Sequence, residues 1–163
     1  EITDQMNNAL PDSISKRVLS LVPKGATVAI LGLAYKPFSH IIEESQSVMI
    51  AKKLANAGAR VLAYDPLASE AIKTELAYHA LVLDSLGECL AEADCVLIAT
   101  PDQVFKALRA PSFGAKPITV FDFWRILDKE LSDKPNIRYV PLGRSIDDEA
   151  NSEKLMQLWS DSV

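Results

Sequence analysis

Lys36 follows a predicted strand and a glycine turn, a position at which a positive charge could bind a phosphate group. The apolar run at residues 28–31 ends in Gly32, and Lys36 follows four residues later. In a nucleotide-binding strand–turn–helix unit, glycines spaced G-x-G-x-x-G let backbone N–H groups approach a pyrophosphate at a helix N-terminus. Only the first of these glycines is present. We therefore predict a nucleotide-binding unit with an altered glycine code, in which the Lys36 side chain supplies the charge.

The elements that must position this lysine alternate between strands and helices. Strands are predicted at residues 27–31, 60–64, 80–83, 94–99, 117–121 and 137–140, and helices at 45–57, 67–77, from Asp84 or Ser85 to 91, and at 102–110. Most of these strands are continuous apolar runs, which is typical of a parallel sheet covered on both faces. The sequence thus predicts a doubly wound, mostly parallel, Rossmann-like α/β fold with an N-terminal helical arm.

Prolines and small polar residues mark the predicted helix ends. Pro11 is expected to interrupt the arm, giving one helix at residues 3–9 and a second that begins at Asp12 or Ser13. Asp65 allows two interpretations. An acid after the second strand of a dinucleotide fold holds a ribose hydroxyl, whereas an acid followed by Pro66 opens a helix, and the proline favours the helix cap.

Ligands of open α/β sheets bind at the carboxyl ends of the strands, near the point where strand order reverses. The residues after strands one, four and five should therefore converge, namely Tyr35, Lys36, Thr100, Pro101, Asp122, Trp124 and Arg125. A lysine and an arginine in one crevice suit a diphosphate, and Trp124 or Tyr35 suits stacking on a ring. Arg125 has an alternative role, an ion pair with Asp122 or Asp128.

Composition and charge exclude several classes of function. The 163 residues, with 48% hydrophobic and 24% charged residues, fit one globular domain. The net charge of −5 and the dispersed basic residues give no footprint for nucleic acid or an anionic membrane.

Cys89 and Cys95, with two scattered histidines, predict buried thiols and no metal site. No signal peptide or apolar run of about 20 residues is visible, so a cytoplasmic protein is expected. The start at Glu1 predicts a piece of a longer chain.

Five segments occur in a fixed order, and together they carry a resemblance. They are LGLAYKP followed by EES, ARVLAYDP at 59–66, ADCVLIAT at 93–100, VFDFWRILD at 120–128 and PLGR at 141–144. The set resembles the C-terminal, nucleotide-sugar-binding domain of the UDP-glucose/GDP-mannose dehydrogenase family over roughly residues 1–145. LGLAYKP is the most specific of the five.

The resemblance implies a function that the residues alone do not. Members of this family oxidise the C6 hydroxyl of a nucleotide sugar to a carboxylate in two NAD-dependent steps, for polysaccharide-precursor synthesis. By resemblance, residues 1–22 end the central dimerisation region and 23–145 bind the nucleotide sugar. Beyond the resemblance, residues 146–163 form an acidic tail, in which Leu155, Met156, Leu158 and Trp159 predict one short docking helix. NAD is then bound mainly by an N-terminal domain outside the chain. The family's catalytic cysteine is absent too, so the chain alone should be inactive. A UDP-sugar is the favoured partner, and a homodimer the expected state of the full-length enzyme.

The resemblance assigns roles and also shows departures. Lys36 would contact the sugar or phosphate, Tyr35 the nucleotide or its backbone neighbourhood, and Arg125 the diphosphate or the cofactor side of the cleft. Three features of the sequence depart from the family pattern. Glu43 replaces an arginine, His40 and Ile41 replace acids, and the family's Asp-Gly-Arg reads Asp122-Phe123-Trp124 with the arginine one place later. An alternative hypothesis is therefore a non-catalytic α/β interaction module with a vestigial crevice. An independent Rossmann dehydrogenase is disfavoured by the single glycine.

Overall fold

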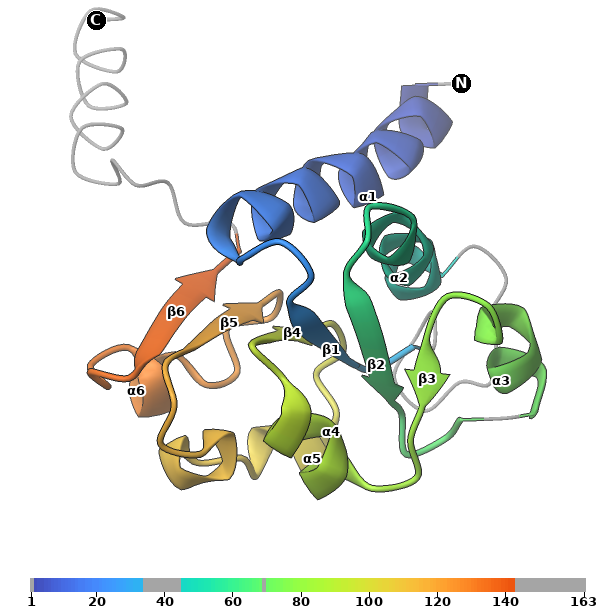
Figure 1. The fold of residues 1–163 in the computed structure, drawn as a ribbon. Helices are drawn as coiled ribbons and strands as arrows, with labels where there is room; N and C mark the ends of the chain where they lie inside the picture. The colour runs from blue at the N-terminus through green and yellow to red at the C-terminus, as the bar shows by residue number, and fades with distance from the viewer. Residues whose placement is uncertain (1, 34–44, 69, 143–163) are drawn as a thin grey trace, which may run out of the picture.

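The computed structural model describes residues 2–33, 45–68 and 70–142, with side chains from Leu10 onward. Strands and helices alternate along the chain after one long N-terminal helix (Figure 1). The elements are α1 Ile2–Leu21, β1 Thr27–Leu31, α2 Gln46–Asn56, β2 Arg60–Tyr64, α3 Glu70–Leu76, β3 Leu81–Val82, α4 Leu86–Glu92, β4 Cys95–Ile98, α5 Gln103–Lys106, the 3-10 helix η1 Ala110–Phe113, β5 Ile118–Asp122, α6 Asp128–Leu131 and β6 Ile137–Pro141.

The sheet has six parallel strands in the order β3-β2-β1-β4-β5-β6. The chain builds outward from β1 to β3 and then returns to place β4 against the other side of β1. In register, Val28 of β1 therefore lies between Val61 of β2 and Cys95 of β4. This order confirms the predicted doubly wound parallel fold, and it puts the reversal of strand order between β1 and β4.

Each face of the sheet is covered by its own set of helices. Val28 and Ile30 point to the face on which α1, α2 and α3 pack, while Ala29 and Leu31 point to the face under α4, α5, η1 and α6. Figure 1 shows the two layers on opposite sides of the strands. Because alternate residues of β1 are buried on both faces, the strand is apolar from Val28 to Leu31, after the half-buried Thr27 at its start.

The predicted break at Pro11 is wrong, because α1 runs without interruption from Ile2 to Leu21. A proline inside a helix costs about 3 kcal/mol through a lost hydrogen bond and a steric clash. Pro11 is itself buried, and Ile14 and Val18 on the following turns join the core with α2. Tertiary burial along the helix offsets the local cost, and sequence periodicity alone does not show that burial.

The predicted start of the third helix is also wrong. Leu67 N donates to Asp65 Oδ1 over 2.8 Å and Ala68 N donates to Asp65 O over 3.0 Å, so a turn follows β2 and α3 begins only at Glu70. Side-chain turn chemistry outcompetes the helix at an Asp-Pro pair. The predicted helix at 102–110 is too long, because α5 ends at Lys106 and η1 begins only at Ala110. Helix α6 was not predicted.

Other helix ends confirm the prediction. Ser85 caps α4 by accepting from Glu88 N, and Gly58 follows α2 with φ of 89°.

Among the described residues, no helix has the length and apolarity that a bilayer crossing requires.

Candidate functional site

The carboxyl ends of β1 and β4 meet with almost no space between them. Gly32 follows β1 with φ of 95°, and a Cβ built on it would lie 2.1 Å from Thr100 Oγ1. Gly32 N also donates to Tyr64 O over 2.8 Å. The glycine is therefore required by the backbone conformation and by the close approach of Thr100, independently of any phosphate.

Asp65 ties the turn after β1 to the turn after β2. Its Oδ2 accepts from Leu33 N over 2.6 Å, its Oδ1 accepts from Leu67 N, and its surface is 7% exposed. In a dinucleotide fold the acid at this position would hold a ribose hydroxyl. Here both oxygens accept from the backbone, and two of the three fingerprint glycines are missing. The residues present therefore do not fit NAD at this crossover.

Leu33 and Ser45 are joined to each other. Ser45 stands at the N-terminal end of α2, but its hydroxyl makes no helix cap and donates instead to Leu33 O over 2.5 Å. The two residues flank the segment 34–44, and both lie at the carboxyl edge of β1. Tyr35 and Lys36 lie within it, outside the described residues, as do His40, Ile41, Glu43 and Glu44.

Trp124 links the end of β5 to the end of β4. Its indole Nε1 donates to Ala99 O over 2.9 Å, while 55% of the residue remains exposed. The structure thus brings together the two strand ends that the sequence predicted to converge. A ring fixed at one edge keeps a face available for stacking.

Asp122 does not serve as an ion-pair partner in the way the sequence alternative supposed. Its carboxylate is fully buried and accepts from Trp124 N, Leu127 N and Tyr139 Oη over 3.1, 2.9 and 2.8 Å. Arg125 is exposed, with φ of 55°. The buried acid thus shapes the turn that carries the arginine.

A cavity of about 310 Å³ opens beside Trp124. Mostly apolar side chains from α1 and from the ends of the strands line it, with the first turn of α2 on one side: Leu10, Ile14, Ala99, Phe123, Trp124, Leu142 and residues 45–47. The sequence did not predict a contribution from α1 or Phe123 to this edge. In the sequence, the apolar residues Ile14 and Val18 predict that one face of this helix is buried. They do not predict which strand ends that face packs against.

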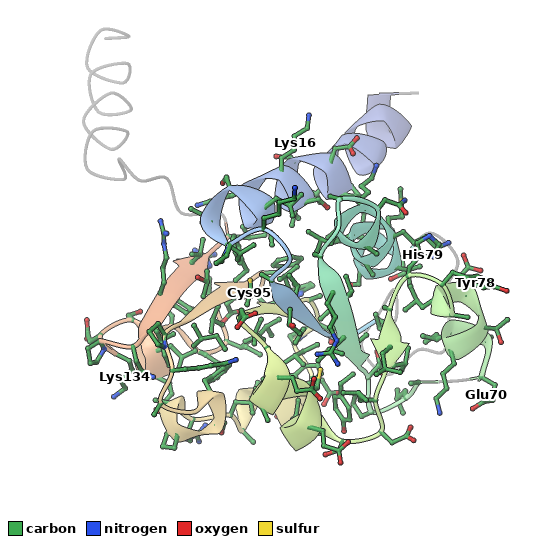
Figure 2. The ribbon with its side chains drawn as sticks, in the orientation of Figure 1. Lys16, Glu70, Tyr78, His79, Cys95 and Lys134 are labelled. Carbon is green, nitrogen blue, oxygen red and sulfur yellow. The ribbon has the colours of Figure 1, made fainter. Side chains whose placement is uncertain are left out.

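Neither cysteine is suited to nucleophilic chemistry. Cys89 in α4 and Cys95 in β4 have no exposed surface, and Figure 2 shows Cys95 inside the molecule. Burial, followed by the charge of Glu92 or Asp94, raises the pKa of each thiol to about 12. Thiolate is the reactive form, so both groups are inert at neutral pH. Within the described ranges, no three His, Cys, Asp or Glu side chains gather as a metal site would require.

Comparison with known proteins gives consistent matches. Residues 29–129 match the UDP binding domain of the UDP-glucose/GDP-mannose dehydrogenase family. The UDP-glucose 6-dehydrogenase of Rickettsia conorii is 32% identical over 146 residues, which cover 86% of this chain and 34% of that protein. The UDP-N-acetyl-D-mannosamine dehydrogenase of Methanococcus maripaludis is 30% identical over 148 residues, covering 85% and 33%.

A solved structure gives the same result in three dimensions. A UDP-glucose dehydrogenase from Pyrobaculum islandicum aligns with a TM-score of 0.58 and 27% identity over 73% of this chain and 26% of that one. The chain spans about a third of the length of the curated relatives it matches.

Proposed function

Because the chain belongs to the UDP-glucose/GDP-mannose dehydrogenase family and carries its UDP binding domain, we propose that it holds the nucleotide of a nucleotide sugar, with a UDP-sugar favoured. The observation that carries this proposal is the match over residues 29–129, which includes the ends of β1, β4 and β5. The alternative, an interaction module with a vestigial crevice, predicts no nucleotide affinity.

In this proposal the ligand lies along the carboxyl edge of the sheet. Lys36 pairs with the diphosphate or contacts the sugar, and Tyr35 contacts the nucleotide. The positions of Leu33 and Ser45 support this, because the two residues that flank Tyr35 and Lys36 in the sequence are hydrogen-bonded to each other at this edge. Trp124 offers a ring face, and Arg125 lies one residue further along the same turn. Two cations suit a diphosphate.

The proposed parent activity is NAD-dependent oxidation of the sugar C6 hydroxyl to a carboxylate, in polysaccharide-precursor synthesis in the cytoplasm. When bound, NAD accepts hydride from the substrate. The described residues do not fit NAD, so its binding is assigned mainly to a part of the enzyme outside this chain. This chain contributes substrate binding and orientation, and alone it should show no turnover. Residues 1–22 would belong to the region through which the full-length enzyme dimerises.

Calorimetric titration of the chain with UDP, GDP, dTDP and NAD at low salt tests the binding role. We expect one nucleoside diphosphate to bind and Lys36→Ala to weaken it at least about tenfold, since a charge-assisted contact contributes about 1.5–3 kcal/mol. Lys24→Ala, which removes an exposed lysine before β1, is the matched control and should leave the affinity unchanged.

Two results would contradict the proposal. If no nucleotide binds, the interaction-module alternative is favoured. If a nucleotide binds equally well to Lys36→Ala and Lys24→Ala, Lys36 is not part of the site.

A further inference from the structure

One buried carboxylate fixes the turn after β5 from its inner side. Asp122 is the last residue of β5 and has no exposed surface. Its Oδ1 accepts from Trp124 N, and its Oδ2 accepts from Leu127 N. Since N–H groups two and five residues further along converge on the same side chain, residues 123–127 are wrapped around it.

The neighbouring strand braces the same carboxylate. Tyr139 of β6 pairs in register with Val120, two residues before Asp122 on the same face of the sheet. Its ring packs against the hydrophobic cluster that contains Leu127, and its hydroxyl donates to Asp122 Oδ2 over 2.8 Å. The acid is therefore held from its own turn and from across the sheet.

The outer side of the turn carries the two exposed side chains. Arg125 has φ of 55°, in the left-handed region that non-glycine residues rarely adopt. Such a conformation persists where the surrounding contacts fix the backbone, and it is common at ligand sites. Besides the bond from its backbone N–H to Asp122, Trp124 makes a second hydrogen bond, in which its indole Nε1 donates to Ala99 O. The turn thus has a rigid, buried inside and an exposed outside with an aromatic ring and a cation.

We propose that Asp122, braced by Tyr139, is a positioning residue that preorganises Trp124 and Arg125 for the ligand. The inference rests on the proposed function, because it concerns the same edge. A turn held in its binding conformation avoids the entropy cost of ordering two long side chains on association. Arg125, which stands one place later than the arginine of the family's Asp-Gly-Arg, is then presented by a turn in which Trp124 precedes it.

The test uses the full chain with Trp159→Phe, so that Trp124 is the remaining one of its two tryptophans. Tyr139→Phe and Asp122→Asn should increase acrylamide quenching of Trp124 and weaken UDP binding about three- to tenfold, as expected for the loss of one hydrogen bond of ordinary net strength. Tyr78→Phe, which changes a residue that is 97% exposed, and Asp133→Asn, which changes an exposed one, should alter neither quantity. Cooperative unfolding establishes that each variant is folded.

A double-mutant cycle separates positioning from a general structural role. In a chain that also carries Trp124→Ala and Arg125→Ala, Tyr139→Phe should no longer weaken UDP, because the side chains through which Asp122 acts are gone. An equal loss in that background would overturn the proposal, as would unchanged quenching and affinity in folded Tyr139→Phe and Asp122→Asn.

Failure of the proposed function gives a different result. If the chain with all its native residues binds no nucleoside diphosphate, the function fails. Increased quenching in Tyr139→Phe would then still support the role of Asp122 in holding Trp124, and unchanged quenching would overturn both inferences.

Discussion

Individual side chains at the carboxyl edge are mostly engaged in holding backbone. Asp65 and Asp122 each follow or end a strand, and each accepts backbone N–H groups with both carboxylate oxygens. Acids at such places are often assigned to ligands. In this chain they shape the turns instead, which leaves Trp124 and the basic residues as the groups that face a ligand in our proposal.

The two cysteines give a prediction at the same scale. Because burial raises the pKa of each thiol to about 12, neither Cys89 nor Cys95 should react with a thiol reagent in the folded chain at pH 8, and both should react after unfolding in urea. The sign for stability follows. The unfolded pKa is near 9, so the thiols stabilise the fold below pH 9, and this contribution is lost as the pH rises toward 12.

The absorbance of the chromophore that the thiol reagent releases measures how many cysteines have reacted. Cys89→Ser and Cys95→Ser variants identify which residue reacts. Rapid labelling of either cysteine in the native chain would contradict the burial argument and reopen the assignment of a nucleophile.

At the scale of elements, the residues that follow β1 and β4 approach closely because Gly32 has no side chain to meet Thr100. Gly32 and Gly58 both have positive φ, but only the first would place a Cβ against a neighbour, whereas Gly58 has nothing within 4 Å. We expect Gly58→Ala to cost about 1–2 kcal/mol for its conformation. Gly32→Ala should cost about 1–3 kcal/mol more, because a methyl group would be forced against Thr100.

Urea unfolding of the two variants checks this difference, with Gly58→Ala as the matched control. The double variant Gly32→Ala/Thr100→Gly should lose less stability than the sum of the losses of the two single variants. The reason is that Thr100→Gly removes the side-chain atoms that the new methyl group would contact. Equal costs for the two glycine substitutions would show that conformation, and not the approach of the strand ends, explains Gly32.

At the scale of the whole molecule, one acid at the amino edge joins the two halves of the sheet. Asp94 precedes β4, accepts from Thr27 N at the start of β1 over 2.9 Å, and pairs with Lys116 before β5 over 3.3 Å. The hydrogen bond from Thr27, and then Lys116, hold the pKa of Asp94 below its usual value of 3.8, against the opposing effect of burial. Its stabilising effect is therefore full above pH 3.8 and is lost as the pH falls through the lowered pKa.

Asp94→Asn should reduce the free energy of unfolding at pH 7 by about 1 kcal/mol, a modest value because the pair with Lys116 is largely screened by solvent. The difference from the unsubstituted chain should shrink below pH 3.8. Thermal unfolding between pH 7 and pH 2.5 measures it, and Asp133→Asn controls for loss of an exposed charge. A difference that stays constant with pH would mean that ionisation of Asp94 is not involved.

The sequence by itself determined the parallel fold, because continuous apolar runs can be buried only between two covering layers. It also fixed β1 and β2 to the residue, since Gly32, Gly58 and charged or polar residues bound those runs on both sides. The ordered motifs gave the family, which the match over residues 29–129 confirms.

Only the tertiary structure decided what the edge residues do. Three features depend on contacts between residues far apart in the sequence: the continuity of α1 through Pro11, the hydrogen bond from Leu33 N to Asp65, and the bracing of Asp122 by Tyr139. Local propensity describes a residue and its near neighbours, whereas burial and the choice of hydrogen-bond partner are set when distant strands come together. An acid after a strand therefore predicts a place at the edge, and packing decides whether it meets a ligand or a backbone N–H.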